Sequence, residues 1–270
     1  MNAARSAPDE LLVAPDPASS YEEACARFAA GIERDSPAID PLSRSRLVTP
    51  GHRAERVVVF FHGLTNAPRQ FDKLSERFIA RGYAVLAPRV PYHGYLDRMT
   101  TDQQNLSVRD LVQVTAESVD LAAGLADEVT VTGISMGGIL AIWAAQYRAV
   151  ALAAPIAPAL GLPKIPYVTT GAIFGAMERL PNRMQWWDPR VKQNLPGPPY
   201  AYPRFATHAL AATQQLGLRL MNVARTERPA ARRIWMISND ADFAVSNAAA
   251  ATLVRRWTET GAASVQAYLF

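Results

Sequence analysis

The residue with the clearest chemical potential is Ser135, at the centre of the sequence Gly-Ile-Ser-Met-Gly at residues 133–137. A β-branched run at 129–132 leads into this sequence, and an apolar helical pattern begins at Gly138. A strand, a sharp turn and a helix in this order form a nucleophile elbow, which exposes a serine hydroxyl at a helix N-terminus. We therefore predict that Ser135 is a nucleophile; the alternative is a glycine-rich turn with an incidental serine.

Two further motifs follow strand-like runs. Residues 57–61 are an uninterrupted β-branched and aromatic run, and they lead into His-Gly-Leu-Thr at residues 62–65. Residues 234–237 form another apolar run, and Asp240 and Asp242 follow it before the next helical pattern. In open parallel sheets, ligands bind at the carboxyl ends of the strands. The three motifs are therefore expected at one edge of a sheet.

In this order, the three motifs resemble the α/β-hydrolase superfamily, and they look closest to its serine esterase, lysophospholipase and monoacylglycerol-lipase-like members. The resemblance covers roughly residues 55–270. It implies that the backbone N–H groups of Leu64 and Met136 form an oxyanion hole. It also implies that Asp242, in an Asp-x-x-Val arrangement, is the acid that orients a catalytic histidine. Asp240 is the competing candidate, but no valine follows it at that distance.

The resemblance also implies a reaction and a substrate class. Ser135 would cleave a small carboxylic ester, carrying an apolar acyl group, through an acyl-enzyme. No metal ion or other cofactor is expected. Thioesterase, peptidase and perhydrolase activities use the same machinery and stay open. A non-catalytic ligand-binding protein and a scaffolding protein of the same fold are alternatives from other functional classes.

The histidine that the resemblance places after the acid is missing from the sequence. All four histidines precede the acid, and they are His52, His62, His93 and His208. The second and third lie beside glycines in loops, where a structural role is expected, and the last begins a helix, where a surface or capping role is expected. We predict that the chain ends before its natural domain does, and that the catalytic histidine lies within a few residues beyond Phe270.

The elements that must position these residues alternate between strands and helices. Strands are predicted at residues 46–48, 57–61, 84–87, 129–132, 149–154, 234–237 and 265–270. Helices are predicted at residues 21–32, from 71 to Gly82, from Ser107 onward, and at 137–147, 206–225 and 244–259. This alternation predicts an α/β fold with a mainly parallel sheet and helices on both faces.

Residues 155–203 interrupt the alternation and hold ten of the twenty prolines. We predict a lid or cap insertion at about residues 156–205 within an α/β-hydrolase domain of residues 46–270. Residues 1–45 are predicted to be an N-terminal tail, mobile over residues 1–20, and a short helix. Apolar residues of the insertion would wall an acyl pocket, or else pack the insertion on the domain: Ile165, Tyr167, Val168, Ile173, Phe174, Met177, Trp186 and Trp187.

Composition and charge argue against several classes of protein. The 270 residues carry a net charge of +4, which comes from scattered arginines. A nucleic-acid-binding protein would gather such charge on one face, so no nucleic-acid partner is expected. Cys25 is the single cysteine, which excludes an intrachain disulfide. The N-terminus lacks the pattern of a signal peptide, and no apolar stretch is long enough to span a bilayer, so a cytoplasmic protein is expected.

Overall fold

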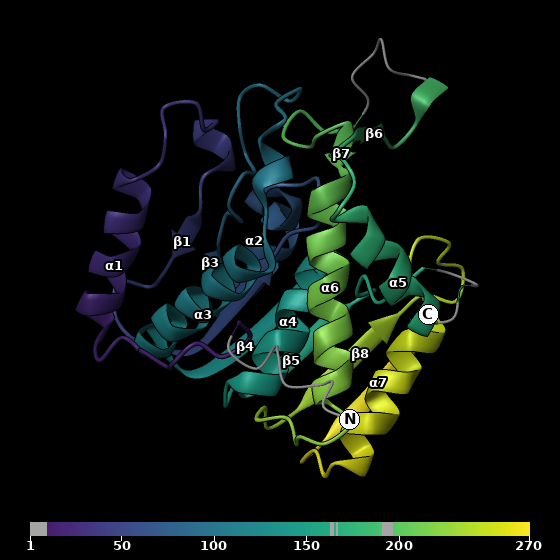
Figure 1. Cartoon of the computed structure of the whole chain (residues 1–270). Coiled ribbons are helices and arrows are strands. Elements are labelled where there is room, and N and C mark those ends of the chain that lie inside the picture. Colours follow the sequence, from purple (N-terminus) through teal and green to yellow (C-terminus); the bar gives the residue numbers. More distant parts are fainter. Residues whose placement is uncertain (1–9, 163–164, 166, 191–196) are drawn as a thin grey trace.

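The computed structural model describes residues 10–162, 165, 167–190 and 197–270 (Figure 1). Within these residues, seven strands form one sheet in the order β1-β3-β2-β4-β5-β8-β9. The first strand pairs antiparallel and all other neighbours are parallel. The strands are β1 (Arg46–Val48), β2 (Ala54–Phe61), β3 (Ala84–Ala87), β4 (Ala126–Ile134), β5 (Leu152–Ile156), β8 (Ile234–Ser238) and β9 (Val265–Leu269). This is the α/β-hydrolase sheet that the motif order predicts.

Helices cover the two faces of the sheet unequally. The helices are α1 (Tyr21–Glu33), α2 (Asp72–Ile79), α3 (Val108–Leu125), α4 (Met136–Tyr147), α5 (Tyr167–Met177), α6 (Thr207–Val223) and α7 (Asn247–Glu259), with short 3₁₀ turns at 41–43, 68–71 and 102–105. The larger hydrophobic core includes residues of α3, α4, α6 and α7, whereas the smaller core on the opposite face involves α2.

The central strand β2 shows why its sequence is continuously apolar. Val57, Val59 and Phe61 belong to the larger core, and Val58 and Phe60 belong to the smaller one. Successive side chains of a strand point to opposite faces, so a strand covered on both sides needs no polar alternation. All five side chains are buried.

Local signals in the sequence also predict where helices begin. The hydroxyl of Ser107 accepts a hydrogen bond from the N–H of Asp110, and the carboxylate of Asp110 accepts one from the N–H of Ser107. This reciprocal capping box satisfies two amide donors that a helix N-terminus leaves unpaired. It starts α3 at the residue after Ser107, as predicted from the sequence.

The segment between β5 and α6, residues 157–206, is here called the insertion. It contains α5 and a two-stranded antiparallel pair, β6 (Met184–Trp186) and β7 (Arg204–Ala206), for which the sequence offered no signal. The strands are only three residues long, and α5 packs beside α6 (Figure 1). Such short elements form because tertiary contacts support them, and local periodicity does not reveal them.

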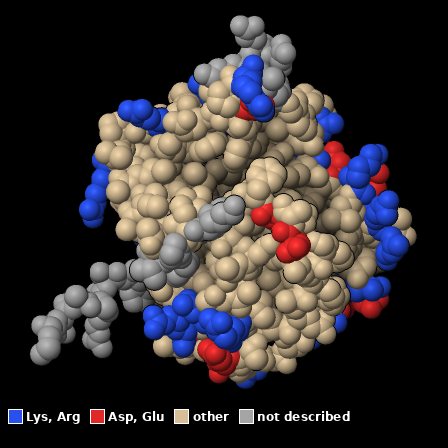
Figure 2. Space-filling model, turned by 90° about the vertical axis from the view of Figure 1, so that its right-hand side faces the viewer, with Lys and Arg blue, Asp and Glu red and all other residues tan. Residues whose placement is uncertain are grey.

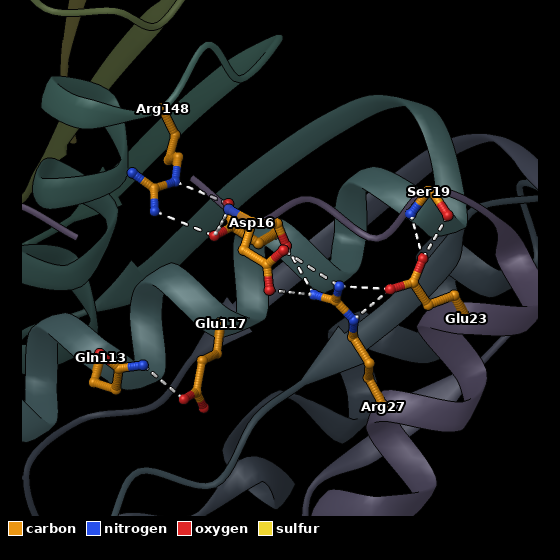
Figure 3. A network of polar contacts seen from close by, with 8 residues as sticks. Asp16, Ser19, Glu23, Arg27, Gln113, Glu117 and Arg148 are labelled. Atoms are coloured by element: carbon orange, nitrogen blue, oxygen red, sulfur yellow. Dashed lines mark hydrogen bonds and ion pairs between the residues drawn. The ribbon is translucent and has the colours of Figure 1, made fainter. Parts of the chain in front are cut away.

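Residues 10–20 lie against α3 and α4, whereas composition predicted a mobile tail over residues 1–20. The side chain of Leu11 is buried, and its carbonyl accepts a hydrogen bond from the indole of Trp143 at 3.0 Å. The N–H of Asp16 donates to the carboxylate of Asp120 at 3.0 Å. Figure 3 shows Asp16 beside this ion-paired region. The correction has a physical reason: buried partners on distant helices, rather than local pattern, hold this segment.

A buried ion pair anchors the segment. The guanidinium of Arg148, at the end of α4, contacts both carboxylate oxygens of Asp120 on α3, at 2.9 and 3.2 Å. Both side chains are less than one-tenth exposed. Arg148 also lies 4.9 Å from the ring centroid of Trp143 and donates to the carbonyl of Val13 at 3.2 Å. The pair therefore links two helices to the N-terminal segment (Figure 3).

Among the described residues, no helix combines the length and the apolar character needed to cross a membrane.

Removing one partner of the buried pair is expected to destabilise the fold strongly. In Asp120→Ala the guanidinium of Arg148 stays buried without its counter-charge, so we expect the free energy of unfolding to fall by about 3–5 kcal/mol. The control is Glu76→Ala, which breaks an exposed ion pair with Lys73 and should change it by less than about 1 kcal/mol. Urea unfolding of both variants measures the difference, and equal effects would refute a structural role for Asp120.

Candidate active site

The strand register places the three motifs at one edge of the sheet. Phe61 at the end of β2 lies opposite Gly133 of β4. Across the next two strands, Ile134 lies opposite Ile156 of β5, and Ile156 lies opposite Ile237 of β8. Each motif begins directly after one of these aligned strand ends. Because neighbouring strands are about 5 Å apart, the elbow and the acid loop are separated by about 10 Å of sheet.

Ser135 has a strained backbone at the turn between β4 and α4. Its φ is 58° and its ψ is −111°, a conformation that non-glycine residues rarely adopt. The surrounding structure holds it: its N–H donates to the carbonyl of Ile156 at 3.1 Å, and its carbonyl accepts from the N–H of Ala159 at 3.1 Å. The Ser135 side chain is half-buried and caps no helix amide. These features are those of the predicted nucleophile elbow.

Backbone strain is concentrated at this edge of the sheet. The described non-glycine residues with positive φ are Tyr92, Ser135 and Ala157, and they follow β3, β4 and β5 respectively. Strained backbones persist only where other contacts hold them, and they cluster at functional sites. Ala157 is held by a hydrogen bond from its N–H to the carbonyl of Ile237 at 2.7 Å.

Two glycines of the elbow are required by close backbone contacts. A Cβ atom on Gly137 would lie 1.9 Å from the carbonyl oxygen of Phe61. A Cβ atom on Gly133 would lie 2.4 Å from the carbonyl oxygen of Gly137. Neither distance is compatible with a side chain, so the sequence Gly-x-Ser-x-Gly follows from the packing of α4 against the ends of β2 and β4.

The two predicted oxyanion-hole residues are buried on either side of this contact. Leu64 is 6% exposed and Met136 is fully buried. Within the described part of the chain, neither backbone N–H donates a hydrogen bond. Unpaired buried N–H groups are rare, because their desolvation costs free energy unless a ligand or water pairs with them. Both amides are therefore available as donors to a bound group.

His62 orients the peptide that carries the Leu64 N–H. Its Nδ1 donates to the carbonyl of Gly63 at 2.9 Å, and this carbonyl also accepts from the N–H of Asn66 at 3.0 Å. In a trans peptide the carbonyl and the following N–H point in opposite directions. Fixing the Gly63 carbonyl therefore fixes the direction of the Leu64 N–H.

His62 is a structural residue, as predicted. The ring is fully buried, and its Nε2 accepts a hydrogen bond from the N–H of Val90 at 3.1 Å. Burial, reinforced by the nearby ring of His93, lowers the pKa of His62 from 6.5 to about 3. The imidazole is thus neutral, and both of its nitrogens are occupied by backbone groups.

The other three histidines also lie away from a catalytic arrangement. His93 is fully buried, burial lowers its pKa, and its ring contacts the carbonyls of Pro91 and Leu64. His208 lies in the first turn of α6, where its ring pairs with the carbonyl of Leu180 at 2.8 Å. His52 is exposed.

The Asp242 carboxylate caps the loop between β8 and α7. Its Oδ1 accepts hydrogen bonds from the N–H of Ala244 at 2.7 Å and from the N–H of Val245 at 3.2 Å. This geometry explains the spacing of the Asp-x-x-Val motif, since Val245 is buried beneath the loop. Asp240 is exposed, and its backbone N–H donates to the carbonyl of Phe270 at 2.9 Å.

The predicted nucleophile, Ser135, and the predicted acid, Asp242, lie at the same edge but are not joined. Among the described residues, no hydrogen bond connects the Ser135 hydroxyl to the Asp242 carboxylate or to a histidine ring. Nor does the described part of the chain contain a cluster of three or more His, Cys, Asp or Glu side chains that could hold a metal ion.

The apolar residues of the insertion divide into buried and exposed sets. Phe174 is 1% exposed, whereas Ile173 and Trp187 are 37% and 56% exposed. The side chains of Tyr167 and Val168 lie outside the described residues. Packing of the insertion on the domain therefore accounts for Phe174, and the predicted acyl pocket stays a prediction.

The surface that carries α5, α7 and the end of β9 is largely uncharged. Figure 2 shows the Lys and Arg side chains mostly at the rim of this face and a small group of Asp or Glu side chains near its centre. Phe243, next to Asp242, and Phe270 at the end of β9 are 90% and 78% exposed. An uncharged surface of this kind suits an apolar ligand better than an anionic one.

Comparison with known proteins identifies the family. The alpha/beta hydrolase family matches residues 58–268. The chain belongs to this family. The thermostable monoacylglycerol lipase of Bacillus sp. (strain H-257) is 30% identical over 115 residues, which are 42% of this chain and 45% of that lipase. The matched region thus spans less than half of the lipase's length.

Solved structures agree with this alpha/beta hydrolase fold. The monoacylglycerol lipase of Paleococcus ferrophilus has a TM-score of 0.63 at 16% identity, over 83% of this chain and 88% of that one. The carboxyl esterase of Bacillus coagulans has a TM-score of 0.61 at 15% identity, over 83% and 84% of the two chains. At these identities the similarity shows the fold.

A methyl group at the elbow of this alpha/beta hydrolase should be far more harmful than one elsewhere. In Gly137→Ala the new Cβ meets the Phe61 carbonyl, so β2 and α4 must separate, and we expect a loss of at least about 3 kcal/mol in the free energy of unfolding. The matched control is Gly31→Ala in the last turn of α1, where nothing lies within 4 Å of the new Cβ. It should raise the free energy of unfolding by less than about 1 kcal/mol. Chemical unfolding measures the free energy of unfolding of both variants, and a Gly137→Ala variant as stable as the wild type would contradict the packing argument.

The buried neutral histidine should make stability depend on pH. The pKa of His62 is about 3 when folded and near 6.5 when unfolded, so below pH 6.5 the unfolded state binds more protons. This contribution is fully present above pH 6.5 and is lost as the pH falls toward 3. Between pH 7 and 5 we expect His62 to reduce the free energy of unfolding by about 2 kcal/mol. Urea unfolding at both pH values measures this loss.

Two variants isolate the histidine responsible. His62→Asn keeps an amide donor for the Gly63 carbonyl but has no titrating group. Between pH 7 and 5 its free energy of unfolding should therefore fall by about 2 kcal/mol less than that of the wild type. His52→Asn removes an exposed histidine, and its free energy of unfolding should fall between pH 7 and 5 by as much as that of the wild type. Identical pH dependence of the two variants would contradict this assignment.

Proposed function

We propose that the chain is a serine hydrolase that cleaves carboxylic esters through an acyl-enzyme on Ser135. The observation that carries this proposal is the strained backbone of Ser135, with a φ of 58°, at the N-terminus of α4. Strained residues that surrounding contacts hold in place cluster at functional sites, and hydrogen bonds to Ile156 and Ala159 hold Ser135. The names of the matched relatives, which are lipases and an esterase, support the same reaction class.

The proposed reaction has two stages. The hydroxyl oxygen of Ser135 attacks the ester carbonyl carbon, a base takes its proton, and the carbonyl oxygen becomes an anion. The N–H groups of Leu64 and Met136 would stabilise this anion, and losing one such donor typically costs a factor of about 10²–10³ in kcat. The alcohol then leaves with a proton, and water releases the acid from Ser135.

Asp242 is the proposed partner of the base. Its Oδ1 is engaged by the amides of Ala244 and Val245, which orients the carboxylate while leaving Oδ2 for an imidazole N–H. His62 and His93 are unsuitable as the base, because backbone groups occupy their ring nitrogens and burial disfavours their cations.

The base stays a prediction, namely a histidine beyond Phe270. The position of β9 supports it. Ser238 of β8 lies opposite Leu269 of β9, and the Phe270 carbonyl accepts a hydrogen bond from the N–H of Asp240. Residues that follow Phe270 would therefore begin beside the loop that carries Asp242. The translated codons after Phe270 in the gene test this prediction, which fails if they encode no histidine near that position.

Covalent labelling of Ser135 tests the proposed function. We expect a fluorophosphonate probe to label the chain, extended by any residues that its gene encodes after Phe270, and labelling to be lost in Ser135→Ala. Ser264→Ala is the control, because Ser264 precedes β9 at the opposite edge of the sheet and should label like the wild type. Absence of labelling in the extended protein would favour a non-catalytic ligand-binding protein of the same fold.

The proposed substrate is a small ester with an apolar acyl group. The uncharged surface around the site and the exposed apolar side chains of Phe243 and Ile173 support it. With a series of nitrophenyl esters, kcat/KM should rise from acetate to octanoate, because each buried methylene contributes about 0.8 kcal/mol at most. A flat or falling series would contradict an apolar acyl pocket, and preference for thioesters or amides would redirect the proposal to those substrates.

A further inference from the structure

The insertion holds Thr65, the residue that follows Leu64, through two hydrogen bonds. The indole Nε1 of Trp187 donates to the hydroxyl of Thr65 at 3.0 Å. The backbone N–H of Tyr202 donates to the carbonyl of Thr65 at 2.7 Å. Thr65 is 7% exposed, so both bonds are largely protected from water. Side chain and main chain of Thr65 are thus tied to a segment more than a hundred residues away.

The two donors lie close to the β6–β7 strand pair of the insertion. The ring of Trp187 lies 4.5 Å from the ring of Phe205 on β7. The backbone N–H of Trp187 donates to the carbonyl of Pro203, which continues the pairing of β6 with β7. Tyr202 is 4% exposed, and its hydroxyl accepts a hydrogen bond from the N–H of Tyr95 at 2.9 Å. Movement of this strand pair would therefore carry both contacts to Thr65 with it.

The remaining contacts of this loop come from the domain. The carbonyl of Leu64 accepts a hydrogen bond from the side-chain amide of Gln103 at 2.8 Å and contacts the ring of His93. The carbonyl of Gly63 is held by His62 and Asn66. The domain thus fixes the two peptides on either side of the Leu64 Cα, and the insertion fixes the next one. Displacing Thr65 would strain or turn the peptide that carries the Leu64 N–H.

We propose that Trp187 is a positioning residue for the oxyanion hole, acting through Thr65 on the Leu64 N–H. The proposal rests on the function proposed above, in which this N–H stabilises the developing anion. The Leu64 donor is then held in place both by the domain and by the β6–β7 pair seated on the loop. Turnover of the acyl-transfer step therefore depends in part on the position of the β6–β7 pair.

The first test follows the loop without requiring activity. Trp187→Phe keeps an aromatic ring against Phe205 but removes the indole N–H, and Thr65→Val keeps the volume but removes the hydroxyl. Because Trp187 is 56% exposed, its substitution leaves the core intact. In both variants we expect hydrogen exchange of the Asn66 and Tyr202 amides to accelerate about fivefold, the effect of one lost hydrogen bond. Unchanged exchange in both variants overturns the proposal.

Two matched controls separate this bond from general effects of substitution. Thr65→Ser retains a hydroxyl acceptor for Trp187 and should exchange like the wild type. Trp235→Phe removes an indole on β8, where the ring lies 5.9 Å from that of Tyr268 and away from the insertion. This substitution should leave the hydrogen-exchange rates of the Asn66 and Tyr202 amides unchanged. If Thr65→Ser accelerates exchange as much as Thr65→Val, the hydroxyl is not the coupling group and the proposal is wrong.

The second test separates kcat from KM, using nitrophenyl acetate because its acyl group is the shortest of the nitrophenyl ester series. In the chain extended by any residues that its gene encodes after Phe270, Trp187→Phe and Thr65→Val should each lower kcat about tenfold, part of the loss expected for an absent oxyanion donor. KM should stay within about twofold, since only transition-state binding changes. The double variant should be no slower than either single variant, because both remove one bond.

Failure of the proposal and failure of the proposed function give different results. If the extended wild type neither reacts with a fluorophosphonate nor hydrolyses the ester, the proposed function fails, and the exchange rates alone decide whether the insertion positions the loop. If the wild type is active but the kcat decreases of Trp187→Phe and Thr65→Val multiply in the double variant, Trp187 and Thr65 act separately and the positioning role is refuted.

Discussion

The close approach of α4 to the end of β2 is the contact on which the rest of the site depends. The carbonyl of Phe61 lies where a Cβ of Gly137 would be, so the helix can begin directly against the strand. This contact turns the chain sharply at Ser135 and produces its positive φ. It also brings the loop after β2 beside the helix N-terminus, so that the amides of Leu64 and Met136 belong to adjacent elements. Without the glycine, these groups would be separated by the width of a side chain.

Buried polar groups behind the loop keep its peptides in place. His62, His93 and Gln103 each contact a carbonyl of residues 63 or 64, and burial lowers the pKa of both imidazoles. A preorganised donor is effective because it does not have to reorient as charge develops. Neutral histidines achieve this without placing a fixed positive charge in the core. Two of the four histidines thus have a structural role, because backbone groups occupy their ring nitrogens.

Two segments without periodic patterns complete the fold by long-range contacts. Residues 10–20 reach α3 and α4 through the buried pair of Asp120 and Arg148. The insertion reaches the loop after β2 through Thr65. Each segment makes contacts with partners distant in sequence. Both could therefore be recognised as irregular from their composition, but their partners could not.

The sequence by itself determined the strands, the main helices and the three motifs, because these depend on local hydrophobic periodicity, capping residues and glycine spacing. The sharp turn at Ser135 and the structural character of His62 could be predicted on that basis. The roles of Ser135 as nucleophile and of Asp242 as acid stay predictions, and the second was implied by the resemblance to the family. Only the tertiary structure decided the strand register that aligns the motifs, the anchoring of residues 10–20 and the contact of Trp187 with Thr65. These features join residues far apart in the chain, and the pairing of such residues depends on packing that no local pattern encodes.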